Sequence, residues 1–225
     1  MLTFDRTSDA GSDRVTFQPA RLIIAGWTGR DQDRVQHHIR ELAAIGVPGP
    51  GSVPLFYRVS ASNLTQDRTL TVLGHASSGE VEPVIVCMDD GLWMGVGSDH
   101  TDREAETVGI ALSKQLCGKP LGRSLWRLDE VLPRYDALIL RAHATIDGTR
   151  TLYQEGCLAE LRSPHDLLDR LEPGLLAPGT VMYGGTVPAI GGIRAAERFE
   201  MELHDPVLGR SLHHAYDVAC LPVVA

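Results

Sequence analysis

The sequence predicts an α+β fold that is rich in β-structure, with mixed sheets and few, short helices. From residue 53 onward, short β-prone runs are separated by Gly, Asp and Ser, which is typical of strands joined by turns. Helical periodicity is confined to residues 31–45, 103–116 and 163–174. We find no internal repeat or low-complexity tract, so one large core is the simplest expectation for 225 residues.

The sequence pattern changes near residue 52, which divides the chain into two regions. Residues 1–52 are expected to hold a loose polar arm, a strand over 21–27 (RLIIAGW) and an amphipathic helix over 31–45. Gly46 and Pro48 supply the stop for that helix. Residues 53–225 are expected to form the main β-rich domain.

The second region contains several strand signals, a helix and a hairpin. The best strand runs are VPLFYRVS, RTLTVLG, EPVIVCM, LWMGVG, DALILRAHATIDG and VMYGG. Ser163 and Pro164 are a favourable start for the helix that ends at Gly174. The closing segment ERFEMELHDPVLGRSLHHAYDV predicts a hairpin around a turn rich in Asp, Pro and Gly.

Composition excludes several classes of function. The formal net charge of −8 argues against a nucleic-acid partner, because binding to phosphates needs clustered Lys and Arg. The four cysteines are widely spaced and form no CxxC pair, so we expect reduced thiols and a cytoplasmic location. No stretch approaches 18 uninterrupted apolar residues, so we expect no membrane segment.

A concentration of acidic residues is the first sign of chemistry. If GEVEPVIV is extended, Glu80 and Glu82 project from the same face, because strand side chains alternate. The residues MDDG favour a turn. The strand LWMGVG would then return antiparallel and bring Asp99 or Asp102 beside the glutamates. Carboxylates held this close favour a bound divalent cation, with magnesium or manganese preferred by oxygen ligands.

Two alternatives stay open at this point. Glu80 and Glu82 are also what a solvated strand face would show, with Asp99 as a loop cap. His100 would suggest zinc or iron, but adjacent strand residues point to opposite faces, so Asp99 and His100 would not easily share one ion.

Four ordered motifs over residues 53–218 resemble the fumarylacetoacetate hydrolase family. They are GEVEPVIV, GVGSDHTDRE, SKQLCGKPLG and the long block from LYQEG to VPAIGG. The resemblance implies a mixed β-roll or sandwich and a divalent-metal site whose ligands are Glu80, Glu82 and Asp99. It also implies a prokaryotic branch of that family.

The resemblance also implies roles for residues around the metal. Lys114 matches the active-site lysine, with Lys119 as a rival that could contact substrate. Thr101 and Arg103 match positions behind Asp99, where Arg103 would orient that carboxylate. The closing block implies substrate contacts from the residues Gln154, Gly185 and Thr186, although Val187 here separates Thr186 from Pro188.

The general base is the least determined part of the site. Family hydrolases use a His and Glu pair on an N-terminal lid, and HHIRE offers His38 and Glu41 at that spacing. The same spacing is also what an exposed helical face gives. His100 and His75 are further candidates for the base.

The family resemblance implies a reaction class. The expected substrate is a 2-oxo or 1,3-dicarbonyl carboxylic acid, and the first expectation is C–C bond hydrolysis of an acylpyruvate-like compound through a metal-stabilised enolate. Decarboxylation, or hydration or dehydration of a 2-oxo acid, is the alternative, as is a non-catalytic metal-dependent binder of organic acids. The resemblance further implies a homodimer.

Overall fold

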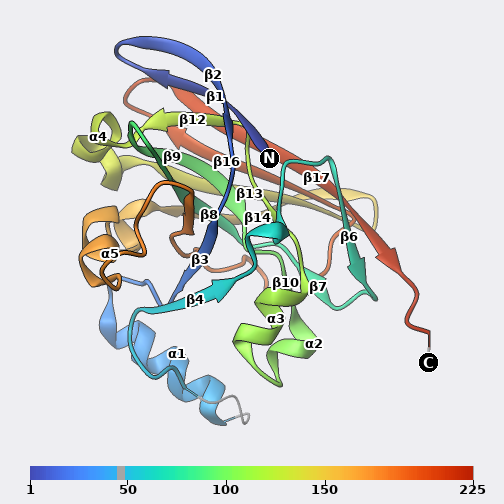
Figure 1. Ribbon diagram of the computed structural model, residues 1–225. Helices are drawn as coiled ribbons and strands as arrows, with labels where there is room; N and C mark the ends of the chain where they lie inside the picture. The colour runs from blue at the N-terminus through green and yellow to red at the C-terminus, as the bar shows by residue number, and fades with distance from the viewer. Residues whose placement is uncertain (45–48, 225) are drawn as a thin grey trace.

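Two β-sheets packed against each other form the body of the molecule in the computed structural model, which describes residues 1–44 and 49–224 (Figure 1). The larger sheet has eight strands in the order β2 (Gly11–Phe17), β1 (Leu2–Ser8), β12 (Ser124–Arg127), β9 (Gly91–Ser98), β8 (Val81–Met88), β15 (Thr180–Tyr183), β3 (Arg21–Gly26) and β4 (Leu55–Val59). The smaller sheet has five, in the order β14 (Thr149–Cys157), β13 (Ile139–Ile146), β16 (Arg198–Asp205), β17 (Arg210–Leu221) and β6 (Thr69–Leu73).

Two short ladders complete the β-structure. The parallel one pairs β5 (Leu64–Thr65) with β11 (Lys119–Pro120), and the antiparallel one pairs β7 (Ser77–Ser78) with β10 (Thr101–Asp102). The β-rich α+β class predicted from the sequence is therefore confirmed.

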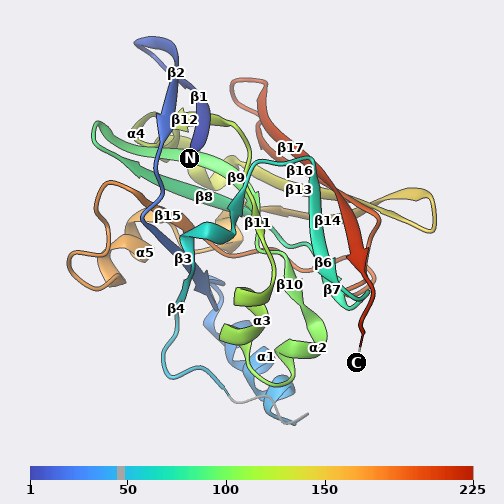
Figure 2. The same ribbon diagram turned by 45° about the vertical axis from the view of Figure 1, so that its right-hand side comes forward.

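The helices are short and lie mostly at one end of the sheets. They are α1 (Gln32–Ala44), α2 (Arg103–Glu106), α3 (Ile110–Leu116), α4 (Leu128–Val131) and α5 (Pro164–Arg170), with 3₁₀ turns at Ala61–Asn63, Leu132–Ala137 and Leu158–Glu160. In two views 45° apart, α1, α2 and α3 gather below the same end of the sheets (Figures 1 and 2). Among the described residues, no helix combines the length and apolar character needed to cross a membrane.

The core follows from the alternation of strand side chains. Every residue of β8 is buried, which explains its nearly continuous apolar run. On one face, Ile85 packs in a cluster between the sheets that also holds Leu140 and Met201. On the other face, Val84 and Val86 join a second cluster. A central strand buried on both faces is a rigid base for the residues at its ends.

The hairpin of β8 and β9 has the predicted form. The two strands pair antiparallel from Val81 opposite Ser98 to Met88 opposite Gly91, so the predicted turn lies at Asp89 and Asp90. The predicted C-terminal hairpin is also present, as β16 and β17. Ser163 caps α5 as expected, since its hydroxyl accepts a hydrogen bond from the Asp166 amide.

The expectation of a loose N-terminal arm is wrong. Residues 2–17 form the antiparallel pair β1 and β2, and β1 also pairs parallel to β12. Leu2 and Phe4 alternate into the core, and this period-two signal is easily overlooked among the polar residues of the segment. Strands from both sides of the predicted boundary at residue 52 therefore share one sheet.

The helix predicted over 103–116 is interrupted. It begins as α2, stops after Glu106 and resumes as α3 at Ile110. The β-branched residues Thr107 and Val108 and the following Gly109 all disfavour helix, and the Thr107 hydroxyl bonds back to the Glu104 carbonyl. The break turns α3 so that Lys114 is buried.

Candidate metal centre and adjoining cavity

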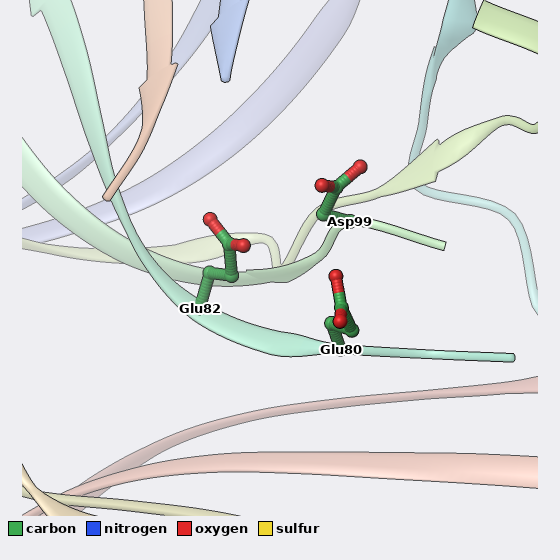
Figure 3. Close-up of side chains that lie close together, drawn as sticks. All are labelled: Glu80, Glu82 and Asp99. Atoms are coloured by element: carbon green, nitrogen blue, oxygen red, sulfur yellow. The ribbon is translucent and has the colours of Figure 1, made fainter. Parts of the chain in front are cut away.

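Three carboxylates meet at the open end of the β8–β9 hairpin. Glu80 directly precedes β8, Glu82 lies within β8, and Asp99 directly follows β9. One ligand atom from each lies within 4.8 Å of the others, and the three carboxyl groups rise on the same side of the hairpin (Figure 3). A backbone hydrogen bond of 3.0 Å from the Asp99 amide to the Glu80 carbonyl fixes the two chain ends together.

The carboxylates are strongly coupled because they are buried. Glu82 is 2% exposed and Asp99 is fully buried. Burial and then the Asp99 charge hold the pKa of Glu82 well above its ordinary value. Burial would also raise the pKa of Asp99, but the ammonium groups of Lys114 and Lys119 outweigh it, and the net pKa lies below the ordinary value. The cluster therefore needs positive charge nearby.

The two lysines occupy different sides of Asp99. Lys114 on α3 contacts Oδ2 of Asp99, and this charge together with Glu80 and Glu82 overcomes burial and raises its pKa. Lys119 on β11 is completely buried, and its ammonium donates to the carbonyls of His100 and Cys117 while lying 3.3 Å from Oδ1 of Asp99. Burial lowers the pKa of Lys119.

The donor set fits a hard divalent cation. All three candidate ligands offer carboxylate oxygens, which Mg²⁺ and Mn²⁺ prefer. Among the described residues, Oδ1 of Asp99 is buried and accepts no hydrogen bond, and its neighbour is the Lys119 ammonium at 3.3 Å. Glu80, Glu82 and Asp99 are thus the residues that could hold the metal.

A cavity of about 810 Å³ adjoins the carboxylates. Glu80, Glu82 and Lys114 line it, whereas Lys119 does not. Its walls come from residues 25–37, from α2 and α3, and from the segment 185–193. Its size is within the range of pockets that take a complete small-molecule ligand.

Comparison with models of protein families identifies the family of this chain. The family model described as "Protein of unknown function (DUF2848)" matches residues 25–216. The chain belongs to the DUF2848 family. A comparison with curated proteins gives no significant match.

The DUF2848 chain has the fold of fumarylacetoacetate hydrolase proteins, as its motifs implied. A yeast protein of that family, ynq8, aligns with a TM-score of 0.62 and 15% identity over 92% of this chain and 95% of its own. A 2-keto-3-deoxy-D-arabinonate dehydratase complexed with magnesium and 2,5-dioxopentanoate gives 0.64 and 15%, over 94% and 84%. The 5-carboxymethyl-2-hydroxymuconate delta-isomerase of Mycobacterium smegmatis gives 0.60 and 15%, over 95% and 82%.

Three residues expected to touch substrate line the cavity of the DUF2848 chain but already have partners. Gln154 accepts from the Val81 amide and donates to the Thr186 hydroxyl and the Val187 carbonyl. The Thr186 hydroxyl donates to the Val81 carbonyl, and the Gly185 amide donates to Oε2 of Glu82 at 2.8 Å. These contacts hold the segment 185–187 against the start of β8.

Arg103 lies beside a different carboxylate from the one expected. Its guanidinium is 3.1 Å from Glu80 and 3.0 Å from Glu106, and its Nε donates to the Ser78 hydroxyl, because α2 begins at Arg103 opposite β7. Asp99 is supported instead by Thr101, whose hydroxyl donates to the Asp99 carbonyl. Asp102 caps α2 through the Ala105 amide.

His100 faces away from the cavity. Its ring nitrogens lie 2.9 Å from the hydroxyls of Tyr216 and Ser77, and the Tyr216 hydroxyl donates to Ser98. Burial and the nearby Lys119 and Arg103 lower its pKa to about 3, so the ring is neutral. This geometry favours a supporting role behind Asp99, and a catalytic role for His100 stays an untested prediction.

The lid residues are partly described. His38 and Glu41 belong to α1, but their side chains lie outside the described part of the structure. Their neighbour His37 lines the cavity, and it is the one histidine that does so among the described residues. His75, the remaining candidate base, does not line the cavity.

Sequence reasoning missed the aromatic part of the cavity. Trp27 and Tyr57 line it, one following β3 and the other within β4. In the sequence, the two residues belong only to the β-prone runs RLIIAGW and VPLFYRVS, which do not indicate which side chains face a cavity.

Proposed function

We propose that this protein is a divalent-metal-dependent enzyme that hydrolyses a C–C bond of an acylpyruvate-like 2-oxo acid. The observation that carries the proposal is the meeting of Glu80, Glu82 and Asp99 at the edge of a cavity that also contains Lys114. The fold is shared with a dehydratase and an isomerase of similar architecture, which supports an enzyme.

The metal would be held by Glu80, Glu82 and Asp99. When bound, the ion supplies Lewis-acid polarisation of a substrate carbonyl and stabilises negative charge. Two of the three carboxylates already pair with cations: Glu80 with Arg103, and Asp99 with Lys114 and Lys119. A loaded centre therefore carries excess positive charge, which complements the anionic head of a 2-oxo acid.

Lys114 is the residue that we assign to the developing oxyanion. Its ammonium lines the cavity, and its raised pKa keeps it charged at neutral pH. A fixed cation beside the reacting group stabilises charge that grows during cleavage. Lys119 is shielded from the cavity, so its role is to hold Asp99 and the backbone around His100.

Hydrolysis also requires a group that takes a proton from water. We assign this role to His37, because it belongs to α1 and lines the cavity. Gln154 and Thr186 have a positioning role. The hydrogen bond between them holds the 185–187 segment, and the Gly185 amide in that segment in turn holds Glu82.

Dehydration of a 2-oxo acid is the second candidate. It is favoured by the structural similarity to a 2-keto-3-deoxy-D-arabinonate dehydratase that was crystallised with magnesium. The same three carboxylates and Lys114 would serve that reaction, but no hydrolytic water is needed. The products separate the two: hydrolysis yields two acids, whereas dehydration yields one unsaturated or rearranged acid and water.

The test is turnover of acetylpyruvate and of a 2-keto-3-deoxy sugar acid with Mn²⁺ or Mg²⁺, followed by product analysis. We expect acetylpyruvate to be cleaved in a metal-dependent manner and Lys114→Met to lower kcat by about 100-fold or more, as loss of an oxyanion donor does. Leu112→Ala, on the exposed side of the same helix, should leave kcat unchanged. Failure of both substrates with either metal would reject the proposal.

A further inference from the structure

Trp27 adopts a strained backbone conformation at the cavity wall. Its φ is +61°, whereas a bulky side chain rarely occupies the left-handed region. Such conformations are energetically costly and persist only where the surroundings enforce them, often at ligand-binding sites. The strain is therefore a reason to ask what the Trp27 ring does.

The chain on both sides of Trp27 is firmly held. Before it, β3 pairs with β15 and β4. After it, the Thr28 carbonyl accepts from the Arg162 amide at 2.8 Å, and the Arg30 amide donates to the Glu160 carbonyl at 2.9 Å. Thr28 also fills the space that a side chain at Gly185 would need. These anchors leave Trp27 little choice of backbone conformation, and Trp27 is part of the cavity wall.

Trp27 and Tyr57 form one continuous surface, here called the aromatic wall. The indole Nε1 donates to the Tyr57 hydroxyl at 3.2 Å. Gly26 permits this arrangement, because a Cβ there would lie 2.8 Å from the Tyr57 ring. The Lys114 ammonium lies 5.7 Å from the centre of the same ring. The aromatic wall thus extends from the lysine at the metal centre into the cavity.

The remaining lining suits an uncharged group. A cavity of about 810 Å³ is far larger than the two adjacent oxygens and three carbons of a chelating head require. Apolar side chains line the rest of it, among them Val35, Ile110, Pro188 and Ile193, and Ile193 is 54% exposed. A ligand tail of the same character would cover this apolar surface.

Charge argues against an anionic tail. Beyond the metal centre, the acids Asp31, Asp33 and Glu160 line the cavity, and Glu106 there is paired with Arg103. The bases there are Arg34 and His37, and Arg103 is already paired with Glu80 and Glu106. A second carboxylate on the substrate would enter an environment with more negative than positive groups.

We infer that the site selects 2-oxo acids whose tail is an uncharged aromatic ring, and that this ring packs on the aromatic wall. The inference rests on the proposed function, because the metal centre must bind the acid head. Trp27 is then the specificity-determining residue, since its strained backbone holds it in the cavity wall beside Tyr57.

Binding of two matched chelators tests the inference without any turnover. Oxamate and N-phenyloxamate carry the same pair of adjacent oxygen donors and differ by one phenyl ring. With Mn²⁺ present, we expect calorimetry to show N-phenyloxamate binding about tenfold or more tighter than oxamate, as a buried apolar group provides. An oxamate derivative with a carboxylate tail of similar length should bind more weakly than N-phenyloxamate.

The decisive variant is Trp27→Gly, because glycine adopts a positive φ without strain and the folded backbone is retained. It should remove the preference for the phenyl compound and leave oxamate binding unchanged, whereas Leu112→Ala should retain the preference. Equal affinity of the native protein for both compounds, or a preference that survives Trp27→Gly, would overturn the inference. If neither compound binds with Mn²⁺, the proposed metal-dependent function itself fails.

Discussion

The amide of Gly185 donates a 2.8 Å hydrogen bond to Oε2 of Glu82, which joins the loop after β15 to a candidate metal ligand. Gly185 has a φ of +99°, and a Cβ at this position would lie 1.7 Å from the Thr28 hydroxyl oxygen. The contact between loop and ligand therefore depends on the absence of a side chain.

Gly185→Ala should destabilise the protein strongly, by about 3 kcal/mol or more, because backbone strain and a steric clash act together. Gly148→Ala is the matched control, since Gly148 also has a positive φ of +71° but open space around its Cβ position. That control should lose only about 1 kcal/mol. Urea denaturation of both variants checks this, and equal losses would contradict the clash.

Metal binding should stabilise the folded protein by mass action. At 100 times the dissociation constant, Mg²⁺ or Mn²⁺ should add about 2.7 kcal/mol and raise Tm. Glu82→Gln should abolish this gain but leave the metal-free protein at least as stable, because Glu82 is buried with a raised pKa. Asp102→Asn, which changes only the cap of α2, should retain the full metal-dependent rise. A Glu82→Gln protein that still responds to metal would exclude Glu82 as a ligand.

Substitution of Lys119 should mainly lower stability, whereas substitution of Lys114 should mainly lower kcat. Lys119→Met removes a fully buried ammonium that bonds two carbonyls and neighbours Asp99, so it should cost about 3–5 kcal/mol of unfolding free energy. Lys114→Met should have a smaller effect on unfolding and a larger one on kcat, because Lys114 lines the cavity. Denaturation curves and steady-state kinetics on both variants measure the split. The reverse ranking would assign the catalytic cation to Lys119.

His100 should make stability depend on pH in the acid range. Its pKa in the folded protein is lowered to about 3 by burial, against about 6.5 when unfolded, so the unfolded state binds the extra proton between these values. The contribution of neutral His100 to the free energy of unfolding is complete above about pH 6.5 and is lost as the pH falls toward 3. His100→Gln should reduce the slope of stability against pH by up to about 1.4 kcal/mol per unit. Leu112→Ala, an exposed substitution on α3 that removes no titratable group, should leave that slope unchanged. An unaltered slope in His100→Gln would show that His100 binds protons equally in the folded and unfolded states, which contradicts the prediction.

The carboxylate cluster could be anticipated because its information is local. Glu80 and Glu82 are two residues apart on a strand, the MDDG turn reverses the chain, and Asp99 follows the returning strand. Strand alternation and turn chemistry are strong local rules, so they placed three side chains correctly without knowledge of the other strands. The β-rich class followed from the same rules applied to the other runs.

The surroundings of the cluster depend on long-range packing, and there the sequence was less informative. Arg103 was expected beside Asp99, but the pairing of β10 with β7 directs it to Ser78 and Glu80. Which lysine faces the cavity depends on the break at Gly109, which rotates α3. The strained Trp27 could not be foreseen, since its conformation is imposed by contacts with residues 160–162.

The three carboxylates all belong to one stretch of twenty residues, whereas the cavity walls come from segments near residue 30, near residue 110 and near residue 190. Substitutions in those walls can therefore change which molecules enter without disturbing the ion-holding hairpin. Such a separation lets one scaffold diversify its choice of substrate during evolution while the chemistry at its centre is inherited intact.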